Sequence, residues 1–140
     1  MFRKKSSDAA NRLASIELFE GFSPEELARV AELADDVDAE PGAVLTEQGK
    51  PGQEAYVIVS GTASVVIGGD VVTTLGAGEL VGEMSLIDNR PRSATVRADT
   101  EMHLLALDVR SFKKLLDELP AANRAVMAKL TERIRKSDSS

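Results

Sequence analysis

The sequence predicts a mainly β protein, an antiparallel barrel or jelly roll with α-helices before and after it. Three observations support this fold class. Short runs rich in β-branched residues alternate with Gly, Pro, Asn and Asp over residues 39–107, which is typical of strands joined by tight turns. Apolar residues at helical spacing precede and follow this region. The 140 residues, 43% hydrophobic and 29% charged, suit a single globular domain over residues 1–140.

Two helices are expected before the barrel, within residues 8–35. The first, over 8–19, carries apolar residues at helical spacing. The second has a stronger signal at its start. Ser23 is a suitable N-cap, Pro24 suits the first helical position, and Glu26 completes a capping box.

The barrel is expected over residues 37–108. Each predicted strand is a short run bounded by turn residues, such as Gly68-Gly69-Asp70. The runs are 44–46, 56–60, 63–67, 71–75, 95–98 and 103–107. Because these runs are short and closely spaced, they favour antiparallel pairing.

Helical periodicity returns over residues 109–136. Asp108 suits an N-cap, and Pro120 is expected to break the region into two helices. The second helix carries an apolar stripe formed by Val126, Met127, Leu130 and Ile134.

Composition argues against several classes of function. No apolar run approaches the roughly 20 residues that cross a bilayer, and the basic start of the chain leads into no secretory signal. We therefore expect a cytoplasmic protein without membrane contact. The chain has no cysteine, a single histidine and a net charge of −6. These features disfavour disulfides, the usual metal centres, a Ser-His-Asp assembly and nucleic-acid binding by the chain alone. We expect no enzyme activity.

The densest group of ligand-binding side chains lies within residues 82–94. Gly82 lets the backbone approach a ligand closely. Residues 83–87 are long enough for about one helical turn, whose first amides have no helical partner. The Arg92 guanidinium can bind two phosphate oxygens at once. Glu83, itself an anion, suits a neighbouring hydroxyl instead, which suggests a nucleotide with one phosphate and a free 2′-hydroxyl.

The segment G-E-M-S-L-I-D-N-R-P-R-S-A-T-V, residues 82–96, resembles the phosphate-binding cassette of cyclic-nucleotide-binding domains. The family includes regulatory subunits of cAMP-dependent protein kinase, the bacterial catabolite activator protein and cyclic-nucleotide-gated channels. Its kinase-type pattern is F-G-E-[LM]-[AS]-L-[IL], four variable positions, then R-[AST]-A-[ST]-V, and Val81 replaces the phenylalanine here. The resemblance covers roughly Ser15–Glu118. It implies an eight-stranded antiparallel β-roll flanked by N-terminal and C-terminal α-helices.

The resemblance also implies roles for individual residues. Arg92 and the backbone amide of Ser85 would bind the cyclic phosphate, and Glu83 would bind the ribose. Ser93 favours cAMP, because threonine at this position accompanies cGMP preference in the family. The other ligand-binding candidates are Val81, Gly82, Met84 and Ala94, and the candidates for a base pocket or lid are Val65, Met127 and Leu130. For Val65, Val81 and Met84, ordinary core packing is the favoured alternative.

These observations predict a sensor of cyclic nucleotides, cAMP with cGMP as the alternative, that needs no other cofactor. Binding would be transmitted through the C-terminal helices to an effector protein that the sequence does not disclose. A homodimer through the C-terminal helix is compatible with the apolar stripe. Two alternatives stay open: a non-catalytic protein-interaction barrel with a silent cassette, and a sensor fragment of a larger transcription regulator, channel or kinase-type protein.

Overall fold

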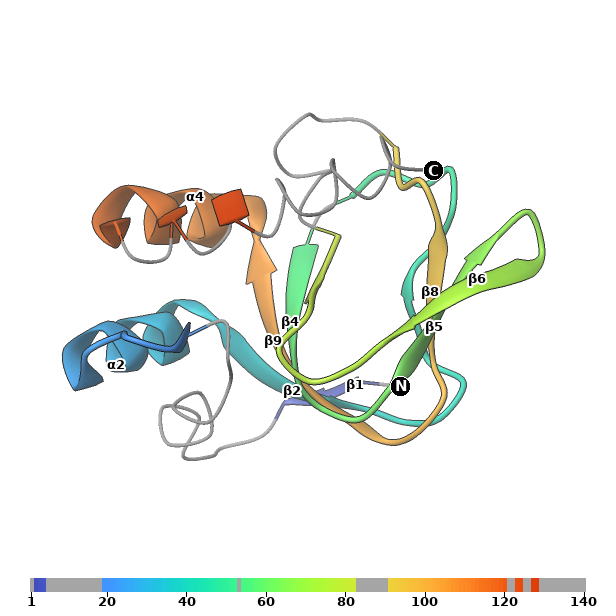
Figure 1. Cartoon of the computed structure of the whole chain (residues 1–140), viewed down its shortest axis with the longest axis horizontal. Coiled ribbons are helices and arrows are strands. Elements are labelled where there is room, and N and C mark those ends of the chain that lie inside the picture. Colours follow the sequence, from blue (N-terminus) through green and yellow to red (C-terminus); the bar gives the residue numbers. More distant parts are fainter. Residues whose placement is uncertain are drawn as a thin grey trace.

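The computed structural model describes residues 2–4, 19–52, 54–82, 91–120, 123–124 and 127–128. Two antiparallel sheets face each other, and helices α2 (Pro24–Leu33) and α4 (Val109–Glu118) lie together on one side of them (Figure 1). The predicted β-roll with flanking helices is confirmed. Most of the helix predicted over 8–19 lies outside the described residues. No described helix is both long and apolar enough to cross a bilayer.

The first sheet has five strands in the order β1-β2-β9-β4-β7. The strands are β1 (Phe2–Lys4), β2 (Asp35–Ala39), β9 (Met102–Asp108), β4 (Glu54–Ser60) and β7 (Leu80–Val81). The central strand β9 is buried over residues 102–107, because it is covered on both faces. The sequence had indicated neither β1 nor β7. The expected start of the barrel, residue 37, lies within β2.

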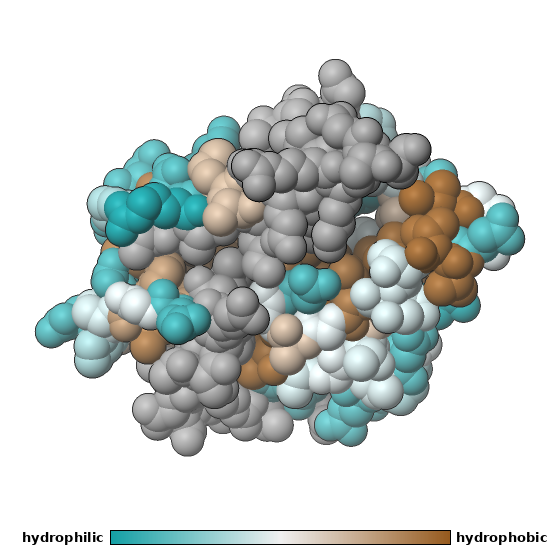
Figure 2. Space-filling model, viewed as in Figure 1, coloured by the Kyte–Doolittle hydropathy of each residue, from teal (hydrophilic) through white to brown (hydrophobic). Residues whose placement is uncertain are grey.

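The second sheet has four strands in the order β3-β8-β5-β6. They are β3 (Val44–Thr46), β8 (Thr95–Ala98), β5 (Ala63–Ile67) and β6 (Asp70–Leu75). The β5–β6 turn is the predicted one: Gly68 and Gly69 have φ of +59° and +88°, which tight hairpins require and glycine adopts without strain. The hairpin extends outward, and an apolar patch covers part of it (Figures 1 and 2).

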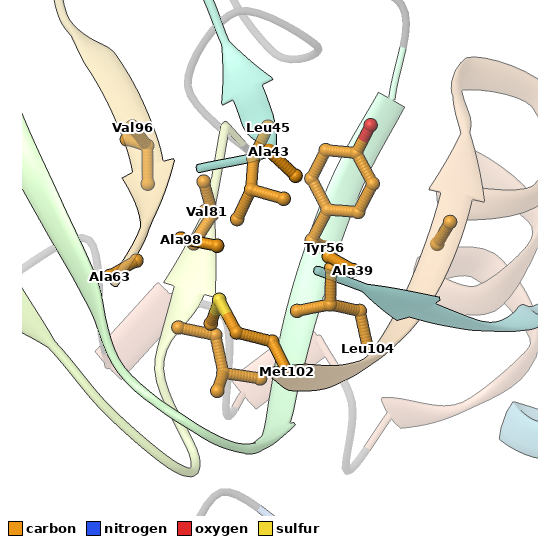
Figure 3. Close-up of a cluster of buried hydrophobic side chains, with 12 residues drawn as sticks. Ala39, Ala43, Leu45, Tyr56, Ala63, Val81, Val96, Ala98, Met102 and Leu104 are labelled. Carbon is orange, nitrogen blue, oxygen red and sulfur yellow. The ribbon is translucent and has the colours of Figure 1, made fainter. Parts of the chain in front are cut away.

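The main core of the roll lies between the two sheets (Figure 3). Alternation along β9 explains how it forms, because neighbouring side chains point to opposite faces of a sheet. Leu104 and Ala106 face this core, whereas Leu105 and Leu107 face a second cluster under the helices. In that second cluster Val30 from α2 and Phe112 and Leu115 from α4 pack together.

Both helices begin at the predicted caps. Ser23 accepts a hydrogen bond from the Glu26 amide at 3.1 Å, and the Glu26 carboxylate accepts one from the Ser23 amide at 2.8 Å. Asp108 accepts from the Ser111 amide at 2.7 Å, and this contact lowers the pKa of its carboxyl group. The helix α4 ends at Glu118, as expected from Pro120.

A buried polar contact joins β2 to β9. The His103 ring lies between two aspartates, with Nδ1 2.7 Å from Asp38 Oδ1 and Nε2 2.5 Å from Asp36 Oδ1. Asp38 and His103 are directly opposite in the strand register. Each ring nitrogen faces a different carboxylate, and no group of His, Cys, Asp or Glu among the described residues could hold a metal ion. The contact therefore ties two strands together.

Candidate functional site

A cavity of about 250 Å³ opens between the sheets on the side of β6, β7 and β8. Its walls are mostly apolar, and Arg92 is the one charged group among the described residues that line it. The lining residues are Thr46, Val65, Thr73, Leu75, Leu80, Val81, Gly82, Arg92, Ser93, Ala94 and Val96. An apolar pocket with a single cation suits a ligand that has a flat apolar part and an anionic part.

The Arg92 side chain is held by main-chain carbonyl groups. Its Nη1 donates to the Gly82 carbonyl at 2.6 Å, and its Nη2 donates to the Glu54 carbonyl. Its backbone is fixed as well, because the Arg92 amide donates to the Lys50 carbonyl and the Gly49 amide donates to the Arg92 carbonyl, both at 2.9 Å. Only 8% of Arg92 is exposed. An arginine is rarely so buried without such partners.

Gly82 is the position where the backbone must come closest to the arginine. Its φ is +82°, and a Cβ placed there would overlap Arg92 Nη1 and lie 2.9 Å from Arg92 Cζ. The same Cβ would lie 3.1 Å from the Glu54 carbonyl oxygen. A side chain at position 82 would therefore displace the guanidinium. The sequence had suggested a close approach to a ligand, and the structure adds a close approach to Arg92.

Tyr56 lies on β4, two residues after Glu54, whose carbonyl accepts a hydrogen bond from Arg92. Its hydroxyl donates to Glu54 Oε1 at 3.2 Å. Burial and the Glu54 carboxylate raise the pKa of Tyr56 to about 12, and the Arg92 charge acts in the opposite direction. The phenol is therefore a hydrogen-bond donor at every physiological pH.

The cavity brings together six of the residues that the sequence singled out: Val65, Val81, Gly82, Arg92, Ser93 and Ala94. Four others, Glu83, Met84, Ser85 and Leu130, lie outside the described residues. Met127 is 45% exposed and does not line the cavity.

The sequence reasoning missed five lining residues, namely Thr46, Thr73, Leu75, Leu80 and Val96. The register of the strands explains why some of these residues line the cavity. Val65 on β5 lies opposite Thr73 on β6 and opposite Val96 on β8, so the three side chains share one face of the sheet. Alternation within each strand was visible in the sequence, but the pairing between strands was not.

Comparison with known proteins identifies the class of molecule. Residues 36–118 match the family model described as Cyclic nucleotide-binding domain. The chain belongs to the cyclic-nucleotide-binding domain family, as the resemblance of residues 82–96 had implied.

Curated relatives include two kinase subunits. The chain is 32% identical to the cAMP-dependent protein kinase type II regulatory subunit of Drosophila melanogaster, over 83% of this chain and 32% of that protein. It is 33% identical to the cAMP-dependent protein kinase regulatory subunit of Emericella nidulans, over 74% of this chain and 26% of that protein. The chain therefore spans about a quarter to a third of the length of these relatives.

Solved structures show the same fold. The catabolite activator protein of Thermus thermophilus matches with a TM-score of 0.78 and 34% identity, over 86% of this chain and 59% of that chain. The regulatory domain of Toxoplasma gondii PKA, crystallised with cAMP, matches with a TM-score of 0.73 and 26% identity, over 89% of this chain and 49% of that chain.

Proposed function

We propose that this chain is a regulatory sensor domain that binds a cyclic nucleotide, cAMP in preference to cGMP, and that it has no catalytic activity of its own. The observation that carries the proposal is a buried arginine on the wall of an apolar cavity, next to a glycine that a larger residue could not replace. This arrangement provides one cation for a phosphate and an apolar surface for a base.

In the proposed complex, Arg92 binds the cyclic phosphate together with backbone amides near Ser85, and Glu83 accepts a hydrogen bond from the ribose 2′-hydroxyl. The base contacts the apolar wall, where Val65 and Val81 lie. Because nucleobases gain dispersion contacts from such a wall, no aromatic side chain is required.

The preference for cAMP rests on three observations. Serine, rather than threonine, occupies position 93, and Ser93 lines the cavity. Both curated relatives described above have names that specify cAMP, and the Toxoplasma gondii regulatory domain was crystallised with cAMP.

The route for signalling is proposed to run from β4 to α4. The Glu54 carbonyl accepts a hydrogen bond from Arg92, and Glu54 lies opposite Asp108 in the register of β4 and β9. Asp108 is both the last residue of β9 and the N-cap of α4. A ligand that shifts Arg92 would thus act on the start of α4 and, through residues 109–136, on a cytoplasmic effector.

Isothermal titration calorimetry of the chain with cAMP and with cGMP tests the proposal. We expect binding of both nucleotides, with cAMP the tighter. Amide hydrogen exchange measured with and without cAMP then tests transmission, and we expect changed exchange in residues 109–135. Failure to bind either nucleotide would refute the function, whereas binding without changes beyond residues 82–94 would refute the transmission.

A further inference from the structure

The Tyr56 hydroxyl and the Glu54 carboxylate form a contact beside the main-chain carbonyl that holds the candidate phosphate-binding arginine. Tyr56 Oη donates to Glu54 Oε1 at 3.2 Å, while the backbone carbonyl of Glu54 accepts a hydrogen bond from Arg92. Glu54 therefore brings an anionic side chain into the neighbourhood of the guanidinium. In this structure the carboxylate is bound by a phenol.

A carboxylate is the natural competitor of a phosphate for an arginine. A carboxylate is planar and a phosphate is tetrahedral, but each is an oxyanion that can accept two parallel hydrogen bonds from a guanidinium. A Glu54 carboxylate turned toward Arg92 would occupy donors that a ligand needs. Its charge would also repel the incoming phosphate.

Tyr56 has the properties required to prevent this competition. It is 7% exposed, and its ring packs in the core between the sheets, so its position is fixed. The hydroxyl oxygen points away from the apolar cluster (Figure 3). Burial and the Glu54 carboxylate raise the pKa of Tyr56 and the Arg92 charge lowers it, consistent with the hydrogen bonds that join Glu54 to both residues.

We propose that Tyr56 is a positioning residue that holds the Glu54 carboxylate away from Arg92, so that the guanidinium can bind a ligand phosphate. The inference rests on the proposed function of the cavity. It goes beyond that function because it assigns a role to two side chains that do not line the cavity.

Four proteins test the inference: the unmodified chain, Tyr56→Phe, Glu54→Gln and the double variant. Each is titrated with cAMP by calorimetry. Tyr56→Phe keeps the ring but releases the carboxylate, so we expect affinity to fall about two- to fivefold, the range that corresponds to one solvent-accessible ion pair. Glu54→Gln removes the competing charge and should bind at least as tightly as the unmodified chain. The double variant should regain the affinity of Glu54→Gln.

The double variant separates positioning from packing. If Tyr56 acted only through packing, Glu54→Gln would not restore binding. Adenosine, which has no phosphate, serves as the control ligand, and its affinity should be the same in all four proteins. Undiminished cAMP binding by Tyr56→Phe, or no recovery in the double variant, would overturn the inference.

Two further outcomes are decisive. If Tyr56→Phe does not fold, Glu54→Gln alone decides: binding at least as tight as that of the unmodified chain supports the inference, and weaker binding overturns it. If the unmodified chain binds no cyclic nucleotide, the proposed function fails and the inference fails with it, a result distinct from a failure confined to the variants.

Discussion

Replacing Gly82 with alanine would separate the cost of backbone strain from the placement of Arg92. Gly82 and Gly42 have nearly the same φ, +82° and +89°. A Cβ at position 42 would meet nothing within 4 Å, whereas a Cβ at position 82 would overlap the Arg92 guanidinium. Gly42→Ala is therefore a matched control that shares the backbone strain without moving the arginine.

The magnitudes follow from these contacts. Left-handed backbone costs alanine about 1–2 kcal/mol, and the loss of glycine freedom in the unfolded chain offsets about 0.4–1 kcal/mol. Gly42→Ala should thus lower the free energy of unfolding by about 1 kcal/mol. Gly82→Ala also disrupts the Arg92 hydrogen bonds to the carbonyls of Gly82 and Glu54. Hydrogen bonds of charged groups contribute about 1.5–3 kcal/mol each. With the backbone cost of about 1 kcal/mol added to the two bonds, a total loss of about 4–7 kcal/mol is expected.

Denaturant unfolding measures the stability of each variant, and calorimetric titration measures its affinity for cAMP. Under conditions where both variants are folded, Gly82→Ala should bind cAMP at least about tenfold more weakly, as expected when one charged hydrogen bond to the ligand is lost. Gly42→Ala should bind like the unmodified chain. Equal destabilisation of the two variants, or undiminished binding by Gly82→Ala, would refute the role assigned to Gly82.

Three other measurements follow from the same structure. Arg92→Ala should weaken cAMP binding by roughly 10- to 200-fold. Arg97 is an exposed arginine on β8, so the control variant Arg97→Ala should leave cAMP binding unchanged. Equal effects of the two substitutions would show that Arg92 does not belong to the site. Tyr56 is the only tyrosine, so its phenolate absorbance should titrate near pH 12 in the folded protein. Because the pKa of Tyr56 is raised on folding, the contribution of this group to stability is complete below about pH 10 and is lost as the pH rises toward 12. A midpoint near pH 10 in the folded protein would contradict the burial of the Tyr56 hydroxyl. Asp108→Ala should lower the free energy of unfolding by about 1 kcal/mol through loss of the helix cap. Because the pKa of Asp108 is lowered in the folded protein, the difference in stability between this variant and the unmodified chain should shrink as the pH falls below about 4. A pH-independent difference would contradict the contact with Ser111.

Local chemistry explains which parts of the fold could be predicted. The caps at Ser23 and Asp108 depend on residues no more than three positions away, so the sequence carried their whole signal. Strand β2 lacked such a signal, because carboxylates are depleted in strands. Within β2, Asp36 and Asp38 are buried against His103, which lies more than sixty residues later in the chain. Only the folded chain brings these groups together.

The candidate site was predictable to a similar extent. Arg92 and Gly82 were found from a continuous motif, and the cavity does include both. Thr73 joins them through strand pairing, and Tyr56 is connected to Arg92 through Glu54 on β4. Neither position belongs to the motif. Their contribution depends on pairing between distant segments, which a single sequence does not reveal.

The β5–β6 hairpin has a practical consequence for anyone who concentrates this protein. Strand β6 is the last strand of its sheet and is exposed along nearly its whole length, with Val71 63% and Val72 54% exposed. Edge strands with apolar side chains invite pairing with further copies, and natural proteins commonly protect such edges with lysine. Val72→Lys should therefore suppress self-association at high concentration, measured by light scattering, without touching the wall of the cavity.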